Sequence, residues 1–234
     1  MQNKVIINIL RMRKELFLLC ITDLMKLNIL QTNTQIPIFK EHIQMIKSSG
    51  FEFLNPKLLS EFFYIEKPEK KFLLTIDDGY SSFYKHAWPY LLENEVPFLI
   101  FISTEAVGKN GYMDWEQIKE IEKFDFVNIG NHSHSHDYLI NFDFKDFEND
   151  IEKSIKIFNQ KLGYNPKFFS YPFGEWDLKQ KKFISQNFEF AFGQHSGVID
   201  LNKDRYELPR FPINEKYGDL ERFKFLVNLL PFQY

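Results

Sequence analysis

Residues 72–83 read FLLTIDDGYSSF, an apolar run followed at once by two neighbouring aspartates and a glycine. The run 72–76 is typical of a strand that is buried on both faces. Asp77 and Asp78 are a poor continuation of such a strand, because aspartate is depleted in strands and adjacent carboxylates repel each other. The stretch therefore predicts that a strand ends here and that a positive charge lies between the two side chains.

The rest of the chain alternates between strand-like and helix-like segments. Apolar runs followed by polar loops, and then by apolar residues at helical spacing, indicate a parallel α/β fold. The predicted strands lie at 71–76, 96–103, 126–130, 167–170, 188–194 and near 206–213, and the predicted helices at 83–93, 114–124, 144–162, 177–187 and 220–230. Asp114 is the expected N-cap of one helix, and Gly163 is placed to end another.

The composition limits the class of protein. Lysine and arginine number 29 and aspartate and glutamate 32, so the formal charge of -3 gives no reason to expect a nucleic acid or an anionic membrane as partner. A hydrophobic content of 44% with 27 phenylalanines predicts a folded, phenylalanine-packed interior. These numbers favour a neutral or weakly charged substrate.

One domain is expected over residues 1–234, because no repeat, linker or change in composition marks a second one. Residues 1–65 are predicted to be a helical extension packed on that domain. The stretch 16–22, LFLLCIT, is short for an export signal and cannot span a bilayer, so we interpret it as a buried helix or strand. Cys20 is the single cysteine, which rules out an internal disulfide.

Unusual polar residues fall at the ends of the predicted strands, where parallel α/β folds assemble their active sites. Side chains alternate along a strand, but Gly79 allows a turn that brings Asp77 and Asp78 toward one cavity. One of them could then bind a cation while its neighbour stays free as a base. An ordinary Asp-Gly turn is the alternative.

Three histidines follow the strand at 126–130, in the segment GNHSHSHDYL. His132 and His136 are four residues apart, which on a helical turn places both imidazoles on one face and points His134 away. Two histidines and one carboxylate leave coordination positions open and suit Zn²⁺, Fe²⁺, Mn²⁺, Co²⁺ or Ni²⁺. A histidine-rich surface loop is the alternative.

Aromatic residues follow the strand at 167–170, in the segment YPFGEW. The turn predicts that the backbone N–H of Phe173 points at a developing oxyanion. Tyr171 and Trp176 offer flat surfaces for a sugar ring, and with Pro172 they are the predicted substrate-binding residues. An ordinary Pro-Gly turn with aromatic packing explains the segment equally well.

Two further polar residues lie near the C-terminus. His195 follows the strand at 188–194 and could protonate a leaving group, although a single loop histidine is more often structural. Arg210 could orient a catalytic carboxylate through a bidentate pair, or it could form a structural salt bridge.

Taken in order and spacing, TIDDG at 75–79, HSHSH at 132–136 and YPFG at 171–174 resemble the first three signature motifs of the polysaccharide deacetylases, carbohydrate esterase family four. The resemblance runs from about residue 71 to 174 and implies a distorted (β/α) barrel. It also implies that Asp77 is the general base and that a divalent metal is held by Asp78, His132 and His136.

The chain departs from this family in three places. Ser170 and Phe173 stand where the third motif often has an arginine and a tyrosine, which puts in doubt an arginine that tunes the base. The C-terminal Leu-x-His is absent, so the acid role passes to His195. The chain also resembles the branch that acts on poly-N-acetylglucosamine, but it lacks the Tyr-His that precedes Asp77 there.

The resemblance implies metal-dependent removal of N-acetyl groups from an amino-sugar polysaccharide or oligosaccharide, with zinc as the expected metal. The same residues would serve an O-acetyl esterase acting on an acetylated glycan, and a non-catalytic carbohydrate-binding descendant is also consistent with the departures. A small-molecule amide or phosphate hydrolase is a third alternative, which a deep closed pocket would favour. The family usually works outside the cytoplasm, so an extracytoplasmic or cell-envelope location is expected.

Overall fold

The computed structural model describes residues 15–21, 34–64, 70–199, 203–213 and 219–229. Its main feature is a curved parallel sheet with the strand order β7-β6-β5-β4-β3-β1-β8, and β2 pairs with β3 beside this path. The strands are β1 (Glu15–Ile21), β2 (Glu52–Phe53), β3 (Lys70–Ile76), β4 (Phe98–Ile102), β5 (Val127–Asn131), β6 (Phe168–Ser170), β7 (Phe190–Phe192) and β8 (Phe211–Pro212). All the pairings between these strands are parallel, as the alternation of segments predicts.

The sheet curls until its two edges approach each other. The segment that leads into β8 runs beside β7, where Leu208 forms a parallel bridge with Phe192. The N–H of Leu208 donates to the carbonyl of Ala191 and the N–H of Gly193 donates to the carbonyl of Leu208, at 2.9 and 3.0 Å. The prediction of a distorted (β/α) barrel is therefore confirmed.

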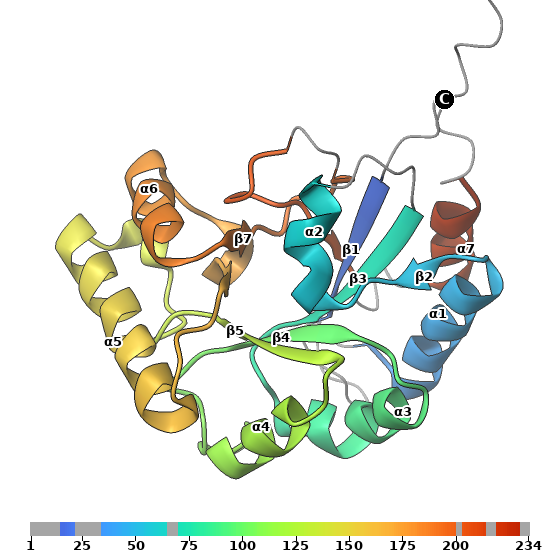
Figure 1. Cartoon of the computed structure of the whole chain (residues 1–234), viewed down its shortest axis with the longest axis horizontal. Helices are drawn as coiled ribbons and strands as arrows, with labels where there is room; N and C mark the ends of the chain where they lie inside the picture. Colours follow the sequence, from blue (N-terminus) through green and yellow to red (C-terminus); the bar gives the residue numbers. More distant parts are fainter. Residues whose placement is uncertain (1–14, 22–33, 65–69, 200–202, 214–218, 230–234) are drawn as a thin grey trace, which may run out of the picture.

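Helices surround the sheet, as Figure 1 shows. They are α1 (Ile36–Ser48), α2 (Leu59–Tyr64), α3 (Trp88–Glu93), α4 (Trp115–Glu122), α5 (Phe144–Leu162), α6 (Leu178–Asn187) and α7 (Leu220–Leu229). A stretch of π-helix, Phe83–Ala87, leads directly into α3, so the single helix predicted at 83–93 has a change of pitch inside it. Within the described residues, no helix has both the length and the apolar character that crossing a membrane requires.

Local signals place the ends of these helices where the sequence predicts them. Asp114 and Asp177 are the N-caps of α4 and α6, and each forms a reciprocal capping box with the glutamine three residues later. Gly163 ends α5 in the left-handed conformation, with a φ of 85°. The helix and strand periods of the sequence are therefore reliable guides to this part of the fold.

Strands that are apolar on both faces divide the core into an interior and an outer layer. In β1, Leu16 and Leu18 face the interior cluster, while Phe17 and Leu19 belong to the cluster between the sheet and the helices. The interior is filled by side chains from strands around the sheet, among them Leu73, Leu99, Phe101, Phe168, Phe190 and Phe192. The barrel is thus packed throughout, and its functional groups can lie only at its ends.

The N-terminal region differs from the helical extension expected for residues 1–65. Residues 15–21 form β1, which lies inside the sheet between β3 and β8. The helical parts of the region are α1 and α2, and Leu59 and Phe62 of α2 pack into the barrel interior. The stretch 16–22, interpreted from the sequence as a buried helix or strand, contributes residues 16–21 to this strand. β1 has seven residues, the length of a buried strand, and its six apolar residues are too few to show a helical period.

Candidate active site

The aspartate pair lies at the carboxyl end of β3. The N–H of Asp77 still donates to the carbonyl of Ile21, at 2.9 Å, so this residue continues the pairing with β1. Asp78 and Gly79 then both adopt a φ of 70°, which turns the chain sharply and directs the two carboxylates to different partners. The turn predicted from the glycine is present, and Asp78 itself takes a left-handed conformation that is unusual for a residue with a side chain.

The histidine loop begins directly after β5 and is not helical. Ser133 and His136 have positive φ values of 67° and 58°, and the loop still brings the rings of His132 and His136 to a centroid distance of 4.8 Å. The ring of His134 points away and pairs with the hydroxyl of Thr104 through Nδ1, at 2.8 Å. The predicted convergence of the outer two histidines is correct, although its structural basis is a tight loop and not a helical turn.

Side-chain acceptors hold this loop in place. The carboxylate of Asp150, on α5, accepts the backbone N–H groups of His134 and Ser135, at 2.8 and 2.9 Å. Asn131 Oδ1 accepts the N–H of Ser133, at 2.8 Å. Because carboxylate hydrogen bonds are about twice as strong as neutral ones, Asp150 is the main anchor of the loop that carries both histidines.

Asp78, His132 and His136 form a group that could hold a metal ion. Their candidate ligand atoms all lie within 4.8 Å of one another, and Asp78 Oδ1 is 3.5 Å from His132 Nε2 and 2.9 Å from His136 Nε2. His132 Nδ1 contacts the carbonyl of Ser170 at 2.7 Å, so it carries the proton and leaves Nε2 as the lone-pair donor. The residues present fit a divalent cation with two nitrogen ligands and one carboxylate ligand.

The electrostatics of the two histidines differ. Burial lowers the pKa of His132, which keeps its imidazole neutral and suited to bind a metal. Burial also acts to lower the pKa of His136, but the neighbouring Asp78 carboxylate outweighs it and raises the pKa above its ordinary value. Protons therefore compete with a metal ion mainly at His136.

Asp77 is paired with Arg210, and both side chains are fully buried. The guanidinium binds the carboxylate in bidentate fashion, with Nη1 2.7 Å from Oδ1 and Nη2 2.9 Å from Oδ2. The thiol of Cys20 donates to the same Oδ2, at 3.3 Å. Burial by itself raises the pKa of Asp77, but the charge of Arg210 outweighs it and holds the pKa below its ordinary value.

Arg210 is the residue whose role the sequence leaves open, and the structure places it on the predicted base. Its Nη2 also donates to the hydroxyl of Ser170, at 2.9 Å, and its Nε to the carbonyl of Gly193, at 2.7 Å. Ser170 stands at the position where the family that the sequence resembles often has an arginine. Arg210, which lies just before β8, thus takes the place of the arginine that the third motif lacks, and it binds the carboxylate of Asp77.

The residues of the YPFG turn divide into buried and exposed ones. Tyr171 and Pro172 are buried, and the Tyr171 hydroxyl donates to the carbonyl of Tyr206, at 3.0 Å. Phe173 is 40% exposed, stacks on Tyr138 at 3.9 Å and lies 5.2 Å from the ring of His136. A sugar ring would therefore meet Phe173 before Tyr171, and the substrate-binding role of Tyr171 and Pro172 stays a prediction.

His195 lies on the same side as this turn. Its ring is exposed and lies 5.7 Å from that of Trp176, which in turn stacks on Tyr171 at 4.9 Å. Its backbone carbonyl accepts the N–H of Arg210, at 2.9 Å, so its main chain is joined to the residue that binds Asp77. Partial burial of this otherwise exposed side chain lowers the pKa of the imidazole. Its role as the acid stays a prediction.

Backbone strain is concentrated at these residues. Five residues other than glycine have positive φ in the described part of the chain, and four of them are Asp78, Ser133, His136 and Phe173. Each such conformation costs about 1–3 kcal/mol and persists only where the surroundings enforce it. Strain of this kind, gathered around one group of side chains, supports a functional role for the group.

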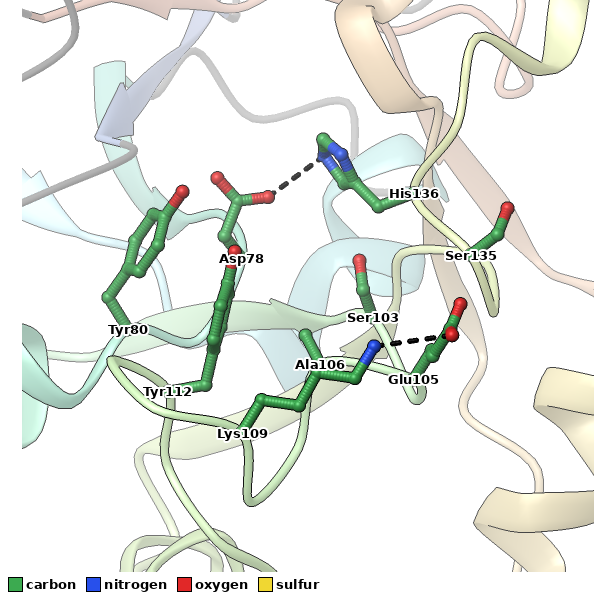
Figure 2. Close-up of a pocket in the computed structure, with 9 residues that line it drawn as sticks. All are labelled: Asp78, Tyr80, Ser103, Glu105, Ala106, Lys109, Tyr112, Ser135 and His136. Carbon is green, nitrogen blue, oxygen red and sulfur yellow. Dashed lines mark ion pairs between the residues drawn. The ribbon is translucent and has the colours of Figure 1, made fainter.

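A cavity of about 190 Å³ adjoins the possible metal ligands (Figure 2). Asp78 and His136 form one side of it, and the loop between β4 and α4 forms the opposite side. The other lining residues are Tyr80, Ser103, Glu105, Ala106, Lys109, Tyr112 and Ser135. Sequence reasoning missed this loop, because only its glycines at 108 and 111 mark it and such glycines indicate no more than a turn.

A comparison with protein families identifies the arrangement. Residues 64–188, more than half of the chain, match the family model described as polysaccharide deacetylase. The chain belongs to this family. The possible metal ligands and the Asp77–Arg210 pair therefore lie on a polysaccharide deacetylase fold, and the family resemblance read from the three motifs is confirmed.

Individual polysaccharide deacetylases are similar to parts of the chain. It is 33% identical over 117 residues to the peptidoglycan-N-acetylglucosamine deacetylase of Bacillus cereus, covering 49% of the chain and 41% of that protein. It is 22% identical over 209 residues to the poly-beta-1,6-N-acetyl-D-glucosamine N-deacetylase of Escherichia coli K12. This match covers 70% of the chain and 31% of that protein. The chain thus spans less than half the length of these two relatives.

The fold has a close counterpart among solved structures. The structure of IcaB from Ammonifex degensii superposes with a TM-score of 0.77 at 22% identity, covering 92% of the chain and 97% of that structure. This likeness extends beyond the part matched by the family model and includes most of the described residues.

Proposed function

We propose that this chain is a metal-dependent hydrolase that removes N-acetyl groups from an amino-sugar polysaccharide or oligosaccharide. The observation that carries the proposal is a buried carboxylate, Asp77, fixed by Arg210 beside the possible metal group of Asp78, His132 and His136. The named substrates of the two relatives, peptidoglycan N-acetylglucosamine and poly-beta-1,6-N-acetyl-D-glucosamine, support an N-acetylated amino sugar.

The chemistry follows from the positions of these groups. A divalent ion, with zinc the best fit to two histidines and a carboxylate, supplies Lewis acidity that polarises the acetyl carbonyl and acidifies water. Asp77 accepts the proton of the attacking water. Its Oδ2 already accepts two donors, Arg210 Nη2 and Cys20 Sγ, whereas within the described residues Oδ1 accepts only Arg210 Nη1. Oδ1 therefore keeps a lone pair free and is the basic atom.

The remaining roles fall to the turn after β6 and the loop after β7. The backbone N–H of Phe173 stabilises the developing oxyanion, and His195 gives a proton to the leaving amine. The low pKa of Asp77 limits its strength as a base, so its contribution depends on orientation, which the bidentate pair supplies.

The rival functions have less support. A non-catalytic glycan-binding role was suggested by the missing arginine and by the missing C-terminal acid. Arg210 removes the first reason, and the second depends on the proposed acid role of His195. A hydrolase of small amides or phosphates would need an enclosed pocket, whereas the cavity is lined by the partly exposed side chains of Glu105 and Lys109. An O-acetyl esterase would use the same residues, so the substrate assay must distinguish it.

The test measures acetate release from chitooligosaccharides, poly-N-acetylglucosamine and acetylated xylan, with each divalent ion added in turn. Activity is expected on the two amino-sugar substrates. Asp77→Asn should retain metal and lose turnover, while His132→Ala should lose both, as determined by metal content after dialysis. Release from xylan alone would contradict N-deacetylation, and full turnover by Asp77→Asn would contradict the role of the base.

A further inference from the structure

The cavity beside the possible metal ligands has a fixed floor. The loop that forms it is bound at one end to the histidine loop, through Thr104 N–H to Ser133 O and Glu105 N–H to His134 O, at 3.2 and 3.0 Å. Its other end is bound to the aspartate turn, through Met113 N–H to Gly79 O, at 2.9 Å. The floor therefore keeps a constant position relative to both loops that carry the possible metal ligands.

Glu105 and Lys109 form an ion pair at this floor, as Figure 2 shows, with Nζ 3.2 Å from Oε1. The side chains are 47% and 58% exposed, and an exposed pair of this kind contributes little to stability. The main chain of Glu105 is fixed at His134, whereas Lys109 bears its charge on a long flexible stem. Lys109 can therefore move away while the main chain of Glu105 stays in place.

Glu105 is the carboxylate of the lining that the possible metal group leaves available to a ligand. Of the nine residues that line the cavity, Asp78 and Glu105 present carboxylates and Lys109 presents an ammonium, but Asp78 belongs to the possible metal group. The hydrogen bond from Lys109 holds the pKa of Glu105 below its ordinary value, so this carboxylate is ionised at neutral pH. When Lys109 moves away, the ion pair is lost and the negative charge of Glu105 remains at the floor, with Lys153 as a further positive charge in its surroundings.

An aromatic pair and hydroxyl groups complete the lining. Tyr80 and Tyr112 stack with ring centroids 4.8 Å apart and an interplanar angle of 26°. Stacked tyrosines present apolar ring surface together with polar hydroxyls, which suits a sugar ring. Ser103 and Ser135 lie across the cavity from this pair (Figure 2). An apolar face, hydroxyls and one carboxylate match an amino sugar that carries a free ammonium.

We propose that this cavity binds the sugar unit next to the one under attack, and that Glu105 recognises a free 2-ammonium group on that unit by displacing Lys109. The inference rests on the proposed function and names its substrate class: amino-sugar chains that already carry some free amines. Such chains are supplied by an earlier deacetylation, either by this protein or by another deacetylase.

The test compares chitooligosaccharides of one length, either fully acetylated or about half deacetylated, by acetate release per remaining acetyl group. For the wild type we expect KM to be on the order of tenfold lower for the half-deacetylated substrate than for the fully acetylated one. This is the size of the effect of one hydrogen bond to a charged group. Glu105→Gln should remove this preference, so that the KM values for the two substrates become equal. Lys109→Met should keep or increase the preference, because it removes only the competing ammonium.

Three results would overturn the inference: equal KM values in the wild type, a preference that survives Glu105→Gln, or a preference lost in Lys109→Met. Isothermal titration of the protein with fully deacetylated and fully acetylated oligomers gives a readout that does not depend on turnover. Tighter binding of the deacetylated oligomer, abolished by Glu105→Gln, would support the inference even if no acetate were released. Absence of acetate release with every substrate would instead refute the proposed function.

Discussion

Replacing Arg210 by methionine tests the buried pair at the predicted base. Methionine fills much of the same volume but removes both donors to Asp77 and those to Gly193 O and Ser170 Oγ. Of the donors in the described part of the chain, the carboxylate would keep only the thiol of Cys20, at 3.3 Å. Because both partners are fully buried, the expected loss in the free energy of unfolding at pH 7 is about 3–5 kcal/mol.

The same loss in the free energy of unfolding can be worked out from the protonation of Asp77. Without Arg210, the buried Asp77 can become neutral by binding a proton. At pH 7 this protonation costs about 1.4 kcal/mol for each pH unit above the unfolded pKa of about 3.9, which is roughly three units. The cost is about 4 kcal/mol, within the range for a broken buried pair. The variant protein therefore avoids a larger penalty by keeping Asp77 neutral.

The two proteins should respond to pH in opposite ways. In the wild type the pKa of Asp77 is lowered, so its stabilisation is present above the unfolded pKa of about 3.9 and is lost as pH falls through the folded value. In Arg210→Met the pKa is raised, so the penalty is absent below about pH 4 and grows by about 1.4 kcal/mol per unit as pH rises. The difference in stability should thus widen from pH 4 to pH 7.

Urea unfolding of the metal-free proteins, followed by tryptophan fluorescence at pH 4, 5.5 and 7, measures this difference. The double variant Asp77→Asn/Arg210→Met is the control, because it removes the carboxylate and should lose the pH dependence that the single variant gains. A stability difference that stays constant between pH 4 and 7 would refute the reasoning. So would a double variant as pH-dependent as Arg210→Met.

Two further substitutions test the loops that carry the possible metal ligands. Asp150→Ala should weaken metal affinity about 10- to 100-fold by isothermal titration, since it frees the N–H groups of His134 and Ser135, while the exposed Glu152→Ala on the same helix should have no effect. Gly79→Ala combines a φ of 70° with a Cβ only 2.6 Å from Ile102 Cδ1, whereas Gly111→Ala has a φ of 90° and open space. Both variants should lower the free energy of unfolding measured in urea, and Gly79→Ala should lower it by at least about 1 kcal/mol more than Gly111→Ala. Equal losses would show that the contact with Ile102 is unimportant.

The sequence determined those features that depend on neighbouring residues. The strand before Asp77 and the helix between Asp143 and Gly163 follow from an apolar run and a helical period, which each segment carries in its own residues. The polar clusters at the strand ends predicted that the aspartate pair and the histidines would converge, because strand ends in a parallel sheet lie at one edge, and the family resemblance singled out Asp78, His132 and His136. For residues 16–22 the sequence left a buried helix or a strand open, because so short an apolar run shows no period, and the structure has the strand β1 there.

Only the tertiary structure decided which distant groups pair. Arg210 meets Asp77 across 133 positions because the curled sheet brings the segment before β8 against β7, from where the Arg210 side chain reaches the end of β3. No local pattern records that closure. Glu105 and Lys109 are only four residues apart, but the position of their ion pair beside the possible metal ligands depends on backbone bonds between three loops. A short-range pattern determines the conformation of a segment, whereas the partner of a buried charge is determined by the packing of the whole barrel.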